Sequence, residues 1–234
     1  MMWADRWKMR VNTDKTKVMV TAVAQNDLKW EPTLMAEETK IKTVSEYKFL
    51  GGNVDNDLRF RGHVNKVVEK GTNRVRILKC MSGKSWGNSL EQQRKLYIQY
   101  CRISMEYSSR SWAPWISKSN LKRIQRVQND AMRSIAGLSK TCPQDFLHLE
   151  TGLEPIKSRF KKLDMLTWDR YARLPPEDSR HKMLDRAIPP RLKTRIGWRW
   201  KTAKLMSRLN YRRAPRGKPS PPWIPVNILS LIHI

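Results

Sequence analysis

Residues 1–57 carry short apolar runs that alternate with turn-forming polar residues. Trp3 and Trp7 stand four positions apart and would share one face of a helix that ends before Asn12. Beyond it, β-branched or alternating runs predict strands at residues 18–23, 33–35, 40–44 and 47–50. The pair Gly51-Gly52 after the last run predicts either a β-bulge or a close approach of the backbone to another group.

After residue 57 the spacing of apolar residues changes to that of amphipathic helices, and four helices joined by short loops predict a small bundle. Capping and breaking residues set their boundaries: one helix ends at Gly83, one is capped by Ser89 with Gln92, one runs from Ser117 or Ser119 to Gly137, and one runs from Pro155 to before Pro175. The residues predicted to face the core are Val64, Val67, Val68, Val75, Leu78, Met81, Leu96, Tyr97, Tyr100, Ile103, Tyr107, Trp112, Pro114, Trp115, Leu121, Ile124, Ala131, Ile135, Ile156, Phe160, Leu163 and Leu166.

The chain changes character again at Pro175-Pro176. Between Arg180 and Lys218, Lys and Arg are frequent, Asp185 is the one acidic residue, and apolar repeats are few. Such a segment buries too little apolar surface to offset the entropy of ordering it, so it is predicted to be largely irregular. Residues 229–234 resemble the translated end of a sequencing adapter and are left out of the fold prediction.

The charge balance narrows the range of partners. The 234 residues include 47 Lys and Arg against 21 Asp and Glu, a formal net charge of +26. An excess of this size favours a polyanionic partner, either nucleic acid or an anionic membrane surface. No run approaches the roughly 20 apolar residues of a spanning helix, and no signal-peptide pattern opens the chain. Nucleic acid is therefore favoured over a membrane, and an intracellular location, nuclear or cytoplasmic, is expected.

The cysteines predict no metal site. Cys80, Cys101 and Cys142 are odd in number and far apart, and none has the spacing of a paired zinc ligand. Reduced cysteines also fit an intracellular protein.

Four blocks occur in one order along the chain: Trp3-x3-Trp7-Lys8-Met9-Arg10-Val11-Asn12-Thr13-Asp14-Lys15-Thr16-Lys17, Tyr47-Lys48-Phe49-Leu50-Gly51-Gly52-Asn53-Val54-Asp55, Trp112-Ala113-Pro114-Trp115, and Val127-Gln128-Asn129-x-Ala131. Together they resemble the closing third of the reverse transcriptase of non-LTR retrotransposons (LINE-type), particularly the Jockey-like and I-like elements. The resemblance implies an α+β, mainly α fold. Residues 1–57 would be the end of the palm with a short β-hairpin, residues 58–175 a helical thumb, and residues 176–228 a basic, largely irregular extension.

The resemblance also implies roles for single residues. Lys15 matches a palm lysine near the incoming triphosphate, where a cation stabilises charge on the leaving pyrophosphate; the alternative is an ordinary exposed turn lysine. Lys48, Gly51 and Gly52 fall in the block that matches the primer grip, where small residues let the backbone approach the primer; the alternative is a purely structural bulge.

The first predicted helix carries cations away from its valine stripe. In the resembled thumb, such a face would follow the phosphates of a template–primer duplex; the alternative is an ordinary solvated face. The cations concerned are Arg61, Lys66, Lys70, Arg74 and Lys79.

In the resembled family the aspartates that hold two catalytic Mg²⁺ ions precede the first block, and neither Asp5 nor Asp14 matches them. We therefore expect a C-terminal polymerase fragment with no cofactor of its own, inactive alone, whose partners are an RNA template, a DNA primer, and the N-terminal palm and fingers of the same polypeptide. The alternative function is a non-enzymatic basic RNA-binding protein built on a helical bundle.

The charge excess predicts salt-sensitive, weakly sequence-dependent binding to nucleic acid. If 6–10 phosphates are contacted, affinity falls by about 10³–10⁵ between 50 and 200 mM salt, because bound counterions are released. Fluorescence anisotropy with labelled duplex and single-stranded oligonucleotides across that range measures the slope. A flat salt dependence, or a strong preference for one sequence, would contradict the prediction.

Overall fold

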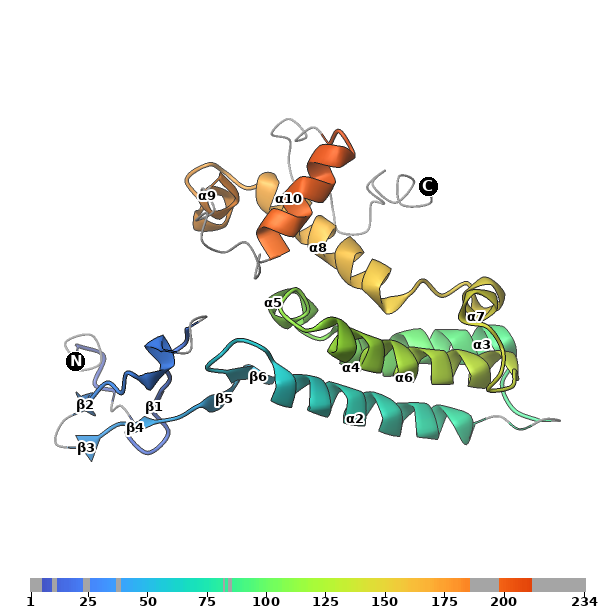
Figure 1. The fold of residues 1–234 in the computed structure, drawn as a ribbon, viewed down its shortest axis with the longest axis horizontal. Coiled ribbons are helices and arrows are strands. Elements are labelled where there is room, and N and C mark those ends of the chain that lie inside the picture. Colours follow the sequence, from blue (N-terminus) through green and yellow to red (C-terminus); the bar gives the residue numbers. More distant parts are fainter. Residues whose placement is uncertain are drawn as a thin grey trace. The chain divides into compact units, whose positions relative to one another are not determined.

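The computed structural model describes residues 6–9, 12–22, 26–36, 39–81, 83, 86–185 and 198–211. The chain divides into two compact units, Met1–Phe160 and Lys161–Ile234. Helices dominate both described parts, and the strands occur only as pairs (Figure 1). The predicted α+β, mainly α class is therefore confirmed.

The strands lie in the N-terminal part of the first unit and form three pairs. β1 pairs in parallel with β4, while β2 pairs with β3 and β5 with β6 in antiparallel fashion. The predicted strand at residues 40–44 is thus divided between β3 and β4. The bounds are β1 Lys17–Val18, β2 Met35–Ala36, β3 Thr39–Lys40, β4 Lys42–Thr43, β5 Glu46–Phe49 and β6 Gly52–Asp55, with a short 3-10 helix η1 at Asp27–Lys29.

Leu50 and Gly51 form the two-residue turn between β5 and β6. Both have positive φ, 45° for Leu50 and 84° for Gly51, as the turns that match the twist of a hairpin require. A Cβ on Gly51 would lie 3.2 Å from the ring of Tyr107, so the backbone does approach another group closely. The predicted bulge is wrong, and the predicted close approach is confirmed.

The helices of the first unit follow the predicted caps at Ser89, Ser117 and Gly137, but the predicted end at Gly83 is wrong, because the first helix ends at Lys79 with Cys80 as its C-cap. Ser89 accepts from the Gln92 amide while the Gln92 side chain accepts from Ser89, and Gly137 ends its helix in the left-handed conformation. Ser117 caps the helix that was assigned to Ser117 or Ser119. The bounds are α2 Arg61–Lys79, α3 Leu90–Leu96, η2 Tyr97–Arg102, α4 Ile103–Glu106, α5 Ser109–Trp112, α6 Lys118–Ala136 and α7 Gln144–Thr151.

Residues 97–102 form a π-helix, η2, between α3 and α4. Its wider turn moves the buried positions to a spacing of four, so Tyr97, Cys101 and Met105 are fully buried. Tyr100, Ile103 and Tyr107, predicted to face the core, are exposed instead. That prediction is wrong because it assumed an uninterrupted 3.6-residue period.

The core of the first unit is built around Trp112, which is almost fully buried. Its ring meets the rings of His63 and Phe160 edge-on, with centroids 5.0 and 5.5 Å away, and its Nε1 donates to the Tyr107 carbonyl at 3.0 Å. The predicted core role of Trp112 is confirmed. Elsewhere in the predicted stripes, Val68, Leu96, Pro114, Trp115 and Leu121 are half-buried and Met81 is exposed.

The block Val127-Gln128-Asn129 lies buried in α6 and has a structural role. Gln128 donates from Nε2 to the Glu154 carbonyl at 2.8 Å, and Gln125 accepts from the amide of Ile156 at 2.9 Å. The same Gln125 donates to Asn129 Oδ1 at 2.8 Å. These side-chain amides satisfy backbone groups between α7 and α8 (Ile156–Ala172), since buried backbone groups need a hydrogen-bond partner within the protein.

The second unit begins within α8 (Ile156–Ala172). Trp168 heads a core whose buried members are Met165, Trp168, Ala172, Leu184 and Met206. Helices α9 (Ser179–Asp185) and α10 (Trp198–Arg208) supply the last two of these. Leu163 and Leu166, predicted to face inward, are only half-buried.

The described parts of the predicted irregular extension, residues 176–185 and 198–211, contain the helices α9 and α10, whereas residues 186–197 and 212–228 lie outside the described residues. The two compact units meet at 160/161, and the prediction placed the start of the extension at 176. Average composition did not predict these two helices, because a few apolar side chains suffice when α8 offers them a complementary stripe. Trp198, for example, meets Trp168 and Tyr171 edge-on at 6.5 and 6.1 Å. Most of the predicted N-terminal helix at residues 1–11 and the adapter-like residues 229–234 lie outside the described residues.

Replacing Trp112→Ala is expected to lower the free energy of unfolding of the first unit by about 3–5 kcal/mol, because a large cavity opens among His63, Phe160 and the Tyr107 carbonyl. Urea unfolding followed by circular dichroism measures the change. Trp86→Ala is the matched control: this side chain is 66% exposed, and its loss should cost less than about 0.5 kcal/mol. Equal effects of the two substitutions would contradict the assigned core.

Candidate nucleic-acid interface

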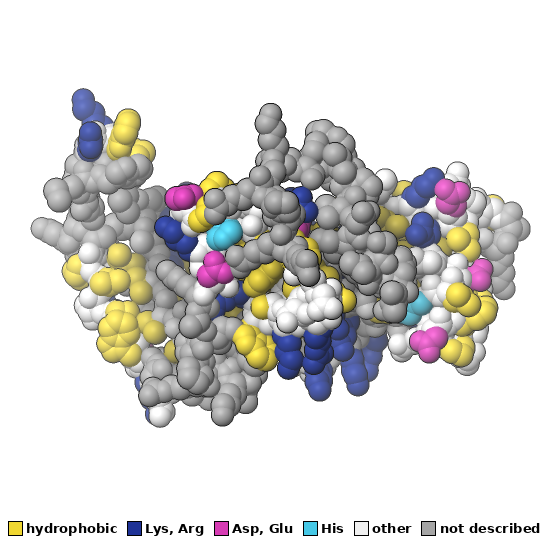
Figure 2. Space-filling view, turned by 90° about the horizontal axis from the view of Figure 1, so that it is seen from above, with side chains coloured by type: hydrophobic (Ala, Val, Ile, Leu, Met, Phe, Trp, Pro, Cys, Tyr) yellow, Lys and Arg dark blue, Asp and Glu magenta, His cyan; other side chains and the backbone are white. Residues whose placement is uncertain are grey.

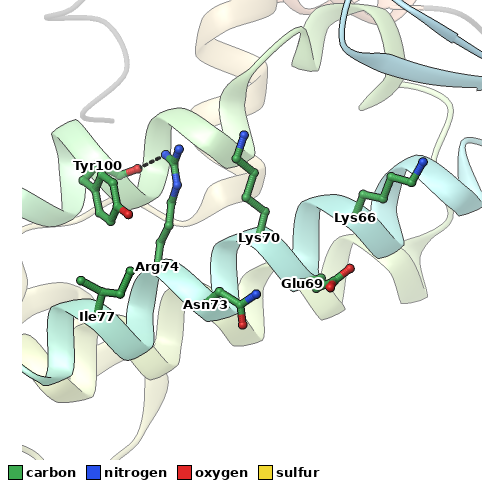
Figure 3. Close-up of a pocket in the computed structure, with 7 residues that line it drawn as sticks. All are labelled: Lys66, Glu69, Lys70, Asn73, Arg74, Ile77 and Tyr100. Atoms are coloured by element: carbon green, nitrogen blue, oxygen red, sulfur yellow. Dashed lines mark hydrogen bonds between the residues drawn. The ribbon is translucent and has the colours of Figure 1, made fainter.

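Lys66, Lys70 and Arg74 lie four residues apart on α2, so each stands one helical turn above the last on one side of the helix. Together with η2 this side encloses a surface hollow of about 350 Å³. Figure 3 shows the three side chains extending from α2, Arg74 and Lys70 toward the segment that carries Tyr100. The residues that line the hollow are Lys66, Glu69, Lys70, Asn73, Arg74, Ile77 and Tyr100.

Tyr100 holds Arg74 in place. The guanidinium carbon lies 4.5 Å from the centroid of the Tyr100 ring, and Nη1 donates to the Tyr100 carbonyl. A guanidinium stacked on an aromatic face keeps its charge while losing little further freedom when it binds an anion. Tyr100 remains 40% exposed and forms one wall of the hollow.

The predicted cationic face is divided. Arg61 and Lys79 lie about 140–180° around α2 from Lys66, Lys70 and Arg74, on the helical period of about 100° per residue. Arg61 pairs with Asp57 at 2.8 Å, and Lys79 pairs with Asp130 at 2.8 Å. The structure therefore brings Lys66, Lys70 and Arg74 together and separates Arg61 and Lys79 from them. In the described part of the chain, the three-residue row itself has no acidic partner within ion-pair distance.

Hydrogen bonds tie the β5–β6 hairpin to the helices. Tyr107 donates from Oη to the Leu50 carbonyl at 2.7 Å, at the turn itself. The Asp55 carboxylate accepts from the amides of Phe60 at 2.9 Å and Arg61 at 3.1 Å, and so caps the N-terminus of α2. Gly51 and Lys48 are exposed on this hairpin, while Gly52 is half-buried at the start of β6.

His63 links the hairpin to the start of the cationic row. Its Nδ1 accepts a hydrogen bond from the backbone N–H of Asn53 at 3.2 Å, whereas the buried Nε2 has no partner in the described structure. Burial lowers the pKa of His63, and the nearby Lys66 charge lowers the pKa further. The ring is therefore neutral at pH 7 and can act as the acceptor that the Asn53 amide requires.

Lys15 lies in an exposed turn at residues 13–15, which follows the predicted helix break. Its amide donates to Asn12 Oδ1 at 2.9 Å, and Thr16 Oγ1 donates to the Asn12 carbonyl at 2.7 Å. Asn12 thus sets the turn by capping it, as its short side chain favours. Lys15 is not among the residues that line the hollow on α2.

The sequence prediction missed Tyr100, Glu69 and Asn73 as members of the site. Tyr100 was assigned to the core because nothing in the sequence signals a π-helix. Glu69 and Asn73 had a usable signal, since they follow Lys66 and Lys70 by three residues each and so share their side of the helix.

Among the described residues, no group of three or more His, Cys, Asp or Glu side chains is arranged to hold a metal ion. No helix there has the length and apolar character needed to cross a membrane. Cys80, Cys101 and Cys142 are free thiols, and burial raises the pKa of Cys101 to about 11. Figure 2 shows one face of the molecule, on which the largest group of Lys and Arg side chains lies together near the lower edge, with others apart from it, while Asp and Glu side chains are scattered singly.

Two proteins of Drosophila melanogaster match this chain. The probable RNA-directed DNA polymerase from transposon BS is 25% identical over 195 residues, which are 80% of this chain and 20% of that protein. The probable RNA-directed DNA polymerase from transposon X-element is 26% identical over 192 residues, 81% of this chain and 20% of that protein. This chain thus spans about a fifth of the length of either relative.

No protein-family profile matches the chain, and no solved structure does. The two matches confirm the resemblance found in the sequence blocks: the chain is similar to a region of the RNA-directed DNA polymerases of transposons.

The neutral His63 predicts a loss of stability in mild acid. Because its folded pKa lies below the unfolded value of about 6.5, the unfolded chain takes up a proton first as the pH falls. The contribution of His63 is complete above about pH 6.5 and falls, by at most about 1.4 kcal/mol per pH unit, until the folded pKa is reached.

The test compares urea unfolding at pH 7.5 and 5.5 for the unaltered chain and for His63→Gln, whose side chain still offers an acceptor. The unaltered chain should lose more free energy of unfolding on acidification than the variant. Equal losses would show that His63 does not titrate differently in the folded state.

Proposed function

We propose that this chain, as a relative of transposon RNA-directed DNA polymerases, is the part of such an enzyme that follows the catalytic aspartates and holds the template–primer duplex. In this proposal residues 1–57 complete the palm and carry a primer-grip hairpin, and the helices that follow form the thumb. The observation that carries it is the row Lys66, Lys70 and Arg74, which lines a hollow without acidic partners in the described structure.

The row suits a duplex backbone for electrostatic reasons. Three cations on successive helical turns repel one another, and nearby phosphates relieve that repulsion while releasing counterions. Tyr100 fixes Arg74, so at least one cation is ordered before the ligand arrives. Such a rigid face binds the shape of an RNA–DNA duplex rather than its sequence, as the copying of templates of any sequence requires.

The hairpin would act on the primer strand of the same duplex. Gly51 offers backbone without a side chain at the turn, and Lys48 offers a cation on β5. Tyr107 and Asp55 hold this hairpin against the helices, so primer and duplex contacts would keep a fixed spacing. Lys15 would supply a cation near the leaving pyrophosphate in the intact polymerase.

Catalysis in the intact enzyme would need Mg²⁺ to align the primer and the incoming nucleotide. The described residues hold no acidic cluster that fits these ions. In this proposal the aspartates of the longer polypeptide hold them, and the residues described here bind and orient the nucleic acid.

The proposal predicts that Lys66→Gln, Lys70→Gln and Arg74→Gln together weaken binding to an RNA–DNA hybrid roughly a hundredfold near 0.1 M salt, since about three phosphate contacts are lost. The slope of log affinity against log salt should fall by about 3, one unit for each contact. Fluorescence anisotropy at several salt concentrations measures both quantities.

The matched control is Lys118→Gln, Lys122→Gln and Lys140→Gln, which removes the same charge from exposed residues outside the hollow. The control should change affinity only slightly and uniformly. If both triple variants bind alike, the binding follows net charge alone and the assigned surface is wrong.

A further inference from the structure

The hollow on α2 contains acceptors as well as cations. Glu69 and Asn73 lie four residues apart, alongside Lys66, Lys70 and Arg74, and both line the hollow. Figure 3 shows them beside the cationic side chains on the same stretch of α2. The hollow is therefore bordered by a row of cations and a row of hydrogen-bond acceptors that both repeat every helical turn, about 5.4 Å.

A carboxylate is costly in a site that binds only phosphates. The DNA backbone offers acceptor oxygens alone, so Glu69 would find no donor on it and would repel its charge. An RNA backbone carries a 2′-hydroxyl on every nucleotide, and this group donates a hydrogen bond. Carboxylate and side-chain amide oxygens are suitable acceptors for that donor.

We infer that this hollow takes the backbone of an RNA strand and distinguishes it from DNA, with Lys66, Lys70 and Arg74 on the phosphates and Glu69 and Asn73 accepting from 2′-hydroxyls. The inference rests on the proposed function, because it concerns the same duplex, and it adds which strand lies in the hollow. In an RNA–DNA hybrid only the template strand carries these hydroxyls. The template strand therefore lies against α2.

Exposure and order support this assignment. Glu69 and Asn73 are exposed, so a ligand can reach them. In the described structure Glu69 pairs with none of the cations of the row, whereas Asn73 Oδ1 accepts from Arg76 Nη1 at 3.3 Å and can accept one further hydrogen bond. The exposed Tyr100 fixes the position of Arg74, which sets the phosphate row relative to the acceptor row.

The experiment uses the full chain and two hybrids of one sequence: RNA–DNA, and the same hybrid with a 2′-fluoro RNA strand. The 2′-fluoro strand keeps an A-form geometry but has no hydroxyl donor, so duplex shape and hydroxyl recognition are separated. The unaltered chain should bind the 2′-fluoro hybrid more weakly, by about fivefold for each hydrogen bond lost. The double variant Glu69→Ala, Asn73→Ala should bind the two hybrids equally.

The ratio of the two affinities is the readout, because removal of the Glu69 charge relieves the repulsion of the phosphates to the same extent in both hybrids. Glu150→Ala with Asn26→Ala is the matched control; both residues are exposed and outside the hollow, and this variant should keep the ratio of the unaltered chain. Circular dichroism of each variant verifies the helices, and the single variants Glu69→Ala and Asn73→Ala should each lower the ratio in part.

Two results would overturn the inference. If the unaltered chain binds both hybrids equally, the hydroxyls are not recognised. If the double variant discriminates as the unaltered chain does, they are recognised elsewhere. Either result leaves the proposed function standing as long as the triple variant of Lys66, Lys70 and Arg74 loses affinity for the hybrid, and a failure of that loss would instead contradict the proposed function.

Discussion

The wide helical turn at residues 97–102 governs the arrangement of the first unit. With an ordinary α-helical period, Tyr100 and Tyr107 would face the same core as Tyr97. The π-helix instead keeps Tyr97, Cys101 and Met105 inside and turns the other two tyrosines outward. Tyr100 then supports Arg74 in the basic hollow, and Tyr107 reaches the carbonyl of Leu50 in the hairpin turn. One change of helical pitch thus supplies a wall of the candidate site and an anchor for its neighbouring hairpin.

The cationic row on α2 carries an electrostatic cost that the other side of the helix does not. Arg61 and Lys79 have carboxylates as partners, so their charges are locally offset. Lys66, Lys70 and Arg74 stand at successive i,i+4 positions, where like charges destabilise a helix by about 0.2–0.5 kcal/mol per pair. The charge of Lys66 also helps to lower the pKa of His63, one helical turn earlier. A row that destabilises its own helix and disfavours the protonated form of its buried neighbour is more easily explained by ligand binding than by folding.

Local chemistry made much of the fold predictable from the sequence. The caps at Ser89, Ser117 and Gly137 depend on side chains and glycine conformations within a few residues, so short patterns suffice to find them. Tertiary pairing accounts for the failures. The pitch of η2 has no sequence signal, and α10 owes its burial to a stripe on α8 far away in the sequence. Likewise, the sequence predicted a cationic face on α2 but not which of its cations are paired, because Arg61 meets Asp57 and Lys79 meets Asp130 only in the folded chain.

The contacts at the start of α2 couple the hairpin to the cationic row. Asp55 caps the helix that carries Lys66, and the Asn53 amide depends on the neutral ring of His63, three residues before that lysine. On its other side the His63 ring meets Trp112 at 5.0 Å, and Trp112 Nε1 in turn is held by the carbonyl of Tyr107. Tyr107 completes this chain of contacts by donating a hydrogen bond from Oη to the carbonyl of Leu50 in the hairpin. Because each link is a directional hydrogen bond or a buried ring contact, the hairpin cannot shift relative to α2 without breaking at least one of them. A duplex that contacts both surfaces would therefore meet a grip of fixed spacing, set by the core rather than by the ligand.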